Sequence, residues 1–332
     1  MIAMGRKVLV TGGAGFVGSK LVPALLNNGH KVNVLDLFLF CDTPFGALSK
    51  NQNLQQYRGD LRDPKIVNEA LSGCDSVIHL ACISNDPSFE LNPSLGKEIN
   101  YDAFRPLVKA SKKAGVSRFI YASSSSVYGI KNENKVTEDL PLEPLTDYSK
   151  YKAMCEDVLA EERTPGFTTL VLRPATVCGY APRLRLDLTV NILTNHAVNN
   201  NKITVFGGGQ KRPNIHIDDM VQLYVNCMTY EDRMIDGLVF NAGYENYQII
   251  EIAEMVRDVI GSSVEIEVAK TDDLRSYHIS SELIKERLGF SPTHAIYDAA
   301  RDLQRSFSCE LANASLSDPK YFNVQMMKKL SI

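Results

Sequence analysis

Short apolar runs alternate with amphipathic segments through the first half of the chain. Runs of aliphatic and β-branched residues predict buried strands, and apolar residues at helical spacing predict the helices between them. The predicted strands are 7–10, 31–37, a short stretch within 54–61, 75–82, 117–126 and 168–177. The predicted helices are 19–30, 64–74, 98–115 and 148–163. This alternation predicts an α/β fold with a Rossmann-type, doubly wound parallel sheet.

From about residue 180 the pattern is less regular. Helices are predicted at 183–200, 249–261, 280–290 and 295–307, and strands within 203–221 and at 236–243 and 265–271. We interpret residues 1–180 as one domain, to which segments of about 212–243 return, and 181–307 mainly as a smaller α/β lobe. Residues 308–332 carry no pattern that predicts an element, and we treat them as a C-terminal tail.

Composition and charge exclude several classes of protein. The chain has 332 residues, 44% of them hydrophobic and 23% charged, with a net charge of -3, which is ordinary for a globular protein. Nothing in this balance indicates a nucleic-acid or membrane partner, and no apolar run approaches the ~20 residues of a membrane span. The seven scattered cysteines contain no C-x-x-C pair, so we expect reduced thiols in a cytoplasmic protein and no metal site.

A glycine-rich turn follows the first predicted strand and opens the first predicted helix. The stretch TGGAGFVG, residues 11–18, places Gly12, Gly15 and Gly18 where a backbone must turn tightly and approach a pyrophosphate. Asp36 ends the second predicted strand, where a carboxylate can accept hydrogen bonds from both ribose hydroxyls. Because this carboxylate would repel a 2′-phosphate, the pattern favours NAD over NADP.

Tyr148 and Lys152 lie four positions apart in the stretch DYSKYKAMCE, and so share one face of the predicted helix. This spacing alone is compatible with ordinary helix surface and with an acid/base pair.

The whole set of motifs resembles the extended short-chain dehydrogenase/reductase family, in its nucleotide-sugar epimerase/dehydratase branch, over about residues 6–307. The matching stretches, besides the glycine turn and Asp36, are GDLRD (59–63), HLAC (79–82), NPSLGKEIN (92–100), SSSSVYG (123–129), YSKYK (148–152), LRPATVCGY (172–180), GGGQKRPNIHIDD (207–219) and FNAG (240–243). Each is weak alone, but their order and spacing are specific.

The resemblance implies a catalytic set of Ser124, Tyr148 and Lys152, acting on a nucleotide-diphosphate sugar with NAD. A phenol titrates near ~10, so the base needs a nearby ammonium to favour its phenolate at neutral pH. The implied cofactor-binding residues are Gly12, Gly15, Phe16, Val17, Gly18, Asp36, Asp60, Leu61, Leu80, Ala81, Cys82, Asn100, Ser123, Tyr148 and Lys152. The implied substrate-binding residues are Asn85, Thr176, Arg212 and Arg275.

Some of these positions have a second interpretation. Asp60 could meet the adenine or cap the following helix, and Asn85 could bind the sugar or cap the segment after it. His79, His216 and Cys178 are expected to be structural.

One departure from the family pattern narrows the chemistry. Dehydratases of this branch carry Asp-Glu directly after the catalytic serine or threonine, where this chain has Ser125 and Ser126. Hydroxyl groups cannot do that acid/base work, so a 4,6-dehydratase is disfavoured. The sequence predicts a 4-epimerase, with a 4-dehydrogenase or 4-keto reductase as the alternative and a non-catalytic dinucleotide-binding regulator as a weaker one. A homodimer is expected through the apolar faces of 98–115 and 148–163.

Overall fold

A seven-stranded parallel sheet forms the centre of the protein. The computed structural model describes residues 5–271 and 276–332, and the sheet has the order β10-β6-β5-β4-β1-β2-β3. Its strands are β1 (Lys7–Thr11), β2 (Lys31–Asp36), β3 (Leu54–Arg58), β4 (Ser76–His79), β5 (Arg118–Ala122), β6 (Thr168–Pro174) and β10 (Leu238–Ala242). All neighbouring strands pair in parallel, which confirms the doubly wound α/β prediction.

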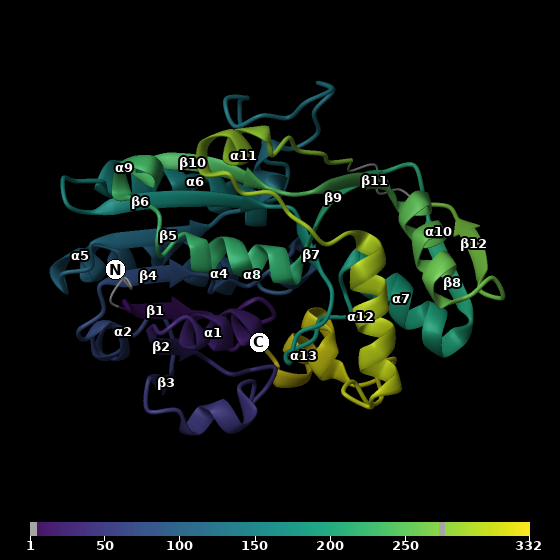
Figure 1. Ribbon diagram of the computed structural model, residues 1–332, viewed down its shortest axis with the longest axis horizontal. Helices are drawn as coiled ribbons and strands as arrows, with labels where there is room; N and C mark the ends of the chain where they lie inside the picture. Colours follow the sequence, from purple (N-terminus) through teal and green to yellow (C-terminus); the bar gives the residue numbers. More distant parts are fainter. Residues whose placement is uncertain (1–4, 272–275) are drawn as a thin grey trace.

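Helices cover both faces of this sheet (Figure 1). Alternate residues along a strand point to opposite faces, so Val8 and Val10 pack in one core cluster and Leu9 in another. The first face carries α1 (Gly18–Asn27) and α8 (Ile217–Asn226). The second carries α2 (Pro64–Leu71), α5 (Phe104–Lys113) and α6 (Asp147–Glu162). None of the described helices is long and apolar enough to cross a bilayer.

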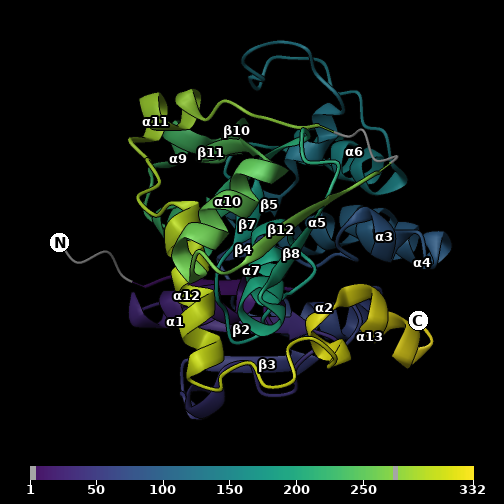
Figure 2. The ribbon, with the colours of Figure 1, turned by 90° about the vertical axis from the view of Figure 1, so that its right-hand side faces the viewer.

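A second lobe has a core of its own, and it faces the viewer in Figure 2. Its helices are α7 (Thr189–Asn200), α10 (Ile249–Ile260) and α12 (Ile296–Ser308), which pack on one another. Two small sheets complete it: β7 (Thr176–Cys178) with β9 (Lys211–His216) and β11 (Glu245–Gln248), and β8 (Lys202–Phe206) with β12 (Glu265–Ala269).

The remaining short helices connect these units. They are α3 (Asp86–Phe89), α4 (Pro93–Lys97), a π-helical turn (Glu98–Asp102), α9 (Asp232–Ile235), α11 (Glu282–Leu288) and α13 (Asn323–Leu330), with 3₁₀ turns at Gly46–Lys50, Ser125–Tyr128 and Pro319–Tyr321.

Three predicted elements differ from the structure. The helix predicted at 183–200 begins only at Thr189, because the backbone N–H groups of Arg183 and Leu186 donate to the distant Ser19 and Tyr321 and not to a preceding helical turn. The strand predicted at 117–126 ends at Ala122 and turns into the 3₁₀ turn. The strand predicted at 168–177 divides after Pro174, and its second part joins the small sheet of the other lobe.

The segment after residue 308, for which the sequence predicted no element, contains α13 and is tied to the rest of the chain. Its Tyr321 carbonyl oxygen accepts a 2.9 Å hydrogen bond from the backbone N–H of Leu186. Long-range contacts of this kind leave no periodic trace in the sequence.

Candidate active site

The glycine turn between β1 and α1 is shaped by close backbone approach. Gly12 has φ +72°, and a Cβ there would lie 2.6 Å from the backbone nitrogen of Ala81. A Cβ at Gly18 would lie 2.5 Å from Gly13. At Gly15 a Cβ would meet only the Gly12 carbonyl oxygen, at 3.1 Å, so this side of the turn stays open for a ligand. Such a turn at a helix N-terminus fits a dinucleotide pyrophosphate.

Backbone donors of the turn are available to that ligand. Within the described part of the chain, the N–H groups of Phe16 and Val17 donate to no protein acceptor. Both directly precede α1, so the helix macrodipole adds to their attraction for an anion.

Asp36, at the end of β2, holds the turn from the other side. Its carboxylate accepts hydrogen bonds from the backbone N–H groups of Ala14, at 3.0 Å, and Phe38, at 2.7 Å. Burial raises the pKa of Asp36, although both hydrogen bonds and the charge of Arg183 oppose that rise. The carboxylate therefore lies directly beside the glycine turn, at the strand end to which the sequence pattern assigned a ribose contact.

Alanine at Gly12 is expected to lower the free energy of unfolding by about 1–3 kcal/mol more than alanine at Gly29, because its Cβ must displace the Ala81 backbone. Gly29 is a matched control, since it has φ +81° and a Cβ added there would meet nothing within 4 Å. Chemical denaturation of both variants, with and without NAD, measures the difference. Equal losses would mean that the close backbone approach at Gly12 does not affect the free energy of unfolding.

Ser124, Tyr148 and Lys152 come together at the carboxyl end of β5. Helix α6 begins at Asp147, where the Thr146 hydroxyl accepts from the backbone N–H of Ser149, so Tyr148 lies in the first helical turn. The Lys152 Nζ donates to the carbonyl oxygen of Ala122 at 2.6 Å and lies 6.0 Å from the centre of the Tyr148 ring.

The surroundings of Tyr148 shift its pKa in opposite directions. Burial raises the pKa of its phenol, and the charges of Cys82 and Asp86 add to the rise. The charge of Arg185 and a hydrogen bond with Ser124 lower it. A phenol held in this way needs additional positive charge before it acts as a base near neutral pH.

A buried ion pair, which the sequence reasoning missed, lies behind this set. Arg173 forms a bidentate ion pair with Glu156, in which Nη2 lies 2.6 Å from Oε2 and Nε lies 3.1 Å from Oε1. The same carboxylate accepts a short hydrogen bond from Ser123, and Arg173 also donates to the Tyr128 hydroxyl at 2.7 Å. Glu156 lies one turn beyond Lys152, so the repeated four-residue spacing through Tyr148, Lys152 and Glu156 was the available sequence signal.

The other predicted cofactor residues lie at the ends of neighbouring strands. Leu80, Ala81 and Cys82 directly follow β4, and Leu61 lies between β3 and α2. The buried Asn100 uses both ends of its amide on the backbone of Ile83, at 2.8 and 3.0 Å, so it fixes the loop after β4.

Two residues with alternative interpretations are now placed. Asp63, and not Asp60, caps α2, while Asp60 accepts from Arg62 at 2.7 Å, a hydrogen bond that lowers the pKa of Asp60. Asn85 caps α3, since its side chain accepts from the backbone N–H of Ser88 at 3.0 Å.

The remaining predicted substrate residues lie in the small sheet of the second lobe, except one. Thr176 on β7 pairs with Asn214 on β9, the strand that also carries Arg212. The guanidinium of Arg212 lies 5.3 Å from the centre of the Tyr277 ring. Arg275 lies outside the described residues.

The three residues predicted to be structural are buried. His79 on β4 hydrogen-bonds to Thr11 at 2.7 Å, and burial lowers its pKa to about 3, with the Lys152 charge adding to the effect. Cys178 packs in the core of the second lobe.

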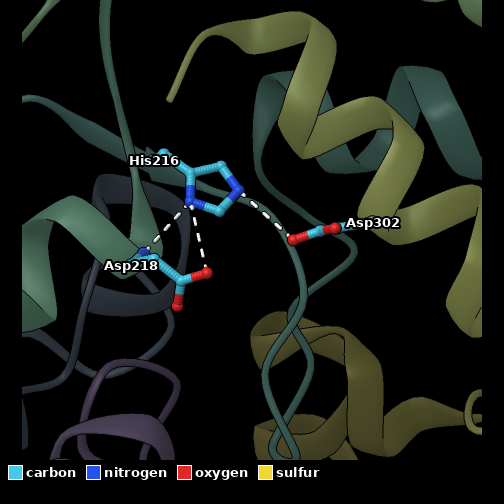
Figure 3. Close-up of side chains that lie close together, drawn as sticks. All are labelled: His216, Asp218 and Asp302. Carbon is cyan, nitrogen blue, oxygen red and sulfur yellow. Dashed lines mark hydrogen bonds and ion pairs between the residues drawn. The ribbon is translucent and has the colours of Figure 1, made fainter. Parts of the chain in front are cut away.

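His216 lies between two carboxylates, Asp218 and Asp302, in an arrangement that invites comparison with a metal centre (Figure 3). Its Nδ1 accepts from the backbone N–H of Asp218 at 3.1 Å and thereby caps α8. In the neutral ring the proton must then sit on Nε2, which faces the Asp302 carboxylate at 3.5 Å. With no lone pair free at Nε2, this geometry is that of a helix cap.

Comparison with known proteins places the relatives of this chain in one enzyme family. The model of the family described as "NAD dependent epimerase/dehydratase family" matches residues 8–243. A UDP-glucose 4-epimerase of Lactobacillus helveticus is 28% identical over 315 residues, covering 88% of this chain and 94% of the relative. A dTDP-glucose 4,6-dehydratase of Streptomyces niveus is 27% identical, covering 88% and 90%.

Solved structures agree with these relatives. The UDP-glucuronic acid 4-epimerase of Bacillus cereus, solved in complex with UDP-glucuronic acid and NAD, is 27% identical with a TM-score of 0.82, covering 92% of this chain and 99% of that chain. The extent of the family match, together with the glycine turn and the Tyr148–Lys152 pair, shows that the chain belongs to the NAD-dependent epimerase/dehydratase family.

Proposed function

We propose that this protein is an NAD-dependent epimerase that inverts C4 of a nucleotide-diphosphate sugar. The observation that carries the proposal is the meeting of Ser124, Tyr148 and Lys152 at the sheet edge that also bears the glycine turn. The relatives named as UDP-glucose 4-epimerases support the choice of reaction and suggest a UDP-sugar.

The glycine turn and Asp36 would hold NAD, which supplies the hydride acceptor and donor of the reaction when bound. The close approach at Gly12, the open side of Gly15 and the free N–H groups before α1 all fit this cofactor. Lys152 orients the nicotinamide ribose and adds positive charge beside Tyr148.

Tyr148 takes the proton of the C4 hydroxyl and returns a proton to the same oxygen after the sugar has presented its other face. Ser124 holds that oxygen through its hydroxyl group. The two positions after Ser124 are also serines, so no carboxylate is present there for an elimination across C5 and C6. The Ser126 hydroxyl lies 2.8 Å from the Ser124 hydroxyl.

Residues 1–180, with segments of about 212–243, are proposed as the cofactor domain, and 181–307 mainly as the sugar-nucleotide lobe. In the small sheet of β7 and β9, Thr176 and Arg212 are proposed substrate contacts, the arginine for the diphosphate. The Asn85 amide oxygen is engaged in its cap, so any sugar contact from this residue would use its NH₂ group.

A panel of nucleotide sugars tests the proposed reaction. We expect interconversion of C4 epimers, followed by NMR, without accumulation of reduced cofactor in the near-ultraviolet absorbance. Stoichiometric reduced cofactor without an epimer would instead establish the alternative, a 4-dehydrogenase or 4-keto reductase. Binding of NAD without turnover of any sugar would favour a regulator.

We further propose a homodimer in the cytoplasm, acting in carbohydrate biosynthesis. The expected interface is formed by α5 and α6, and Met154 on α6 is 39% exposed. All seven cysteines are free, which fits a reducing compartment.

A further inference from the structure

Two buried arginines lie in the non-helical segment that precedes α7. Arg183 is 3% exposed and Arg185 is 8% exposed. Neither belongs to the catalytic set, and neither residue's role follows from the glycine turn. Guanidinium groups at this depth require acceptors, because an unsatisfied buried cation is costly.

The acceptors supplied by the protein do not satisfy these two groups. Among the described residues, Nε and Nη1 of Arg183 and Nη2 of Arg185 have no hydrogen-bond partner. Arg183 has one hydrogen-bonding partner for its guanidinium, the side-chain oxygen of Asn323, and its flat face lies 4.0 Å from the centre of the Phe40 ring. Three buried N–H-bearing nitrogens are therefore left for a ligand.

The neighbouring carboxylates are already engaged. Asp187 accepts from Arg185 at 2.9 Å and from the backbone N–H of Asn323 at 3.0 Å. The Asp36 carboxylate accepts from the backbone of the glycine turn and of Phe38. Burial, together with the charge of Arg185, lowers the pKa of Arg183 to about 9.

The position of the pair indicates which anion completes it. The backbone N–H of Arg183 donates to the Ser19 hydroxyl in the first turn of α1, at 3.2 Å. The charge of Arg183 acts on Asp36, at the ribose end of the site, and that of Arg185 acts on Tyr148, at the catalytic end. A dinucleotide that spans these two ends carries its diphosphate between them.

We propose that Arg183, supported by Arg185, binds the diphosphate of NAD together with the open backbone N–H groups before α1. A planar guanidinium with two adjacent free donors matches two phosphate oxygens. The cofactor would then be held by backbone dipoles and by a full positive charge from a residue 164 positions beyond Ser19 in the chain.

The C-terminal segment positions this arginine. Asn323, 3% exposed at the start of α13, contacts Arg183 through its side-chain oxygen and donates from its Nδ2 to the Ser84 hydroxyl at 2.9 Å. Ser84 also accepts from Arg185 at 3.0 Å. The segment after 308 therefore acts as a positioning element of the cofactor site.

The inference rests on the proposed NAD site but not on the proposed epimerisation, and it is tested by binding to the full-length chain. Isothermal titration with NAD, ADP, adenosine and UDP compares the wild type with Arg183→Met, which keeps the apolar stem of the side chain. We expect Kd for NAD and ADP to rise by about 10- to 100-fold, with adenosine and UDP unchanged. Asn323→Ala should weaken NAD and ADP about 3- to 10-fold.

A matched control is provided by Arg58, the last residue of β3. Arg58 lies 4.8 Å from the centre of the Phe38 ring and binds Asp42 at 2.6 Å on the surface, so Arg58→Met should leave Kd for NAD and ADP within about twofold. If Arg183→Met does not fold, Arg183→Lys keeps the charge without the planar donors and should weaken ADP about 3- to 10-fold.

Weaker UDP binding with unchanged ADP binding would overturn the inference, because the anion would then belong to the nucleotide sugar. Unchanged binding of both ligands by a folded Arg183 variant would also overturn it. A wild-type chain that binds neither NAD nor ADP would instead contradict the NAD site itself.

Discussion

Replacing Tyr148 with phenylalanine is expected to lower kcat by about 10²–10⁴-fold while NAD remains bound. The variant removes one hydroxyl and keeps the ring, so its cost is the loss of proton transfer at the reacting oxygen. Its measurement is the rate of C4 epimer formation, with retained cofactor determined after gel filtration.

Tyr151→Phe provides the matched control on the same helix. Its ring stacks on Tyr101, with centroids 5.5 Å apart, so it serves packing and should leave kcat within about twofold. A Tyr148→Phe enzyme with full activity would remove Tyr148 from the catalytic assignment.

The kcat/KM of the wild-type enzyme should also depend on pH through Tyr148. Burial raises the pKa of Tyr148, and the reactive form of a base is its deprotonated one. Below that pKa the phenolate fraction falls as pH falls, so log kcat/KM should rise with pH by about 1 per pH unit on the acid limb. The Tyr148→Phe variant should lose this dependence, whereas loss of a merely structural hydroxyl would leave its slope unchanged.

Replacing Glu156 with glutamine should lower the free energy of unfolding by about 3–5 kcal/mol, because Arg173 then remains buried without its counter-charge. Both side chains are nearly inaccessible, at 7% and 6% exposure, so water cannot compensate for the missing partner. Urea denaturation followed by circular dichroism measures the loss.

Glu161→Gln is the control on the same helix, because Glu161 pairs with Arg105 at the surface, where its side chain is 62% exposed. We expect no measurable change in its unfolding midpoint, since exposed pairs are weak. The double variant Glu156→Leu/Arg173→Met should recover much of the loss, because it leaves no unpaired charge in the core. A stable Glu156→Gln protein would show that the pair is dispensable.

Activity of the Glu156→Gln protein separates stability from function. Glu156 accepts from Ser123, which directly precedes Ser124, and lies one turn from Lys152. We therefore expect kcat to fall even at urea concentrations below the unfolding transition, where the variant is folded. KM for the sugar should stay nearly constant, as for a residue that positions catalytic groups.

The parts of the site that could be predicted from the sequence are those encoded locally. The glycines at 12, 15 and 18 are required by one turn, Asp36 follows from strand length, and Tyr148 and Lys152 follow from one helical face. The parallel, doubly wound sheet was implied by the alternation of elements, because parallel strands need helical crossovers. In each of these features the physical constraint acts between residues only a few positions apart.

The remaining features depend on contacts between distant segments. Arg173 lies 17 positions from Glu156, and Arg183 lies 140 positions from Asn323. The stretch RLRLDL was predicted as helix, although its backbone N–H groups at Arg183 and Leu186 bond to the distant Ser19 and Tyr321.

The sequence by itself determined the fold class and the glycine turn, because turns, strands and helix faces obey spacings of a few residues, and the resemblance of its motifs implied the role of Tyr148 and Lys152. Only the tertiary structure decided which charges are buried together. A buried guanidinium is stable only with an acceptor, and acceptors such as Glu156 and Asn323 are brought to it by folding and not by proximity in the chain.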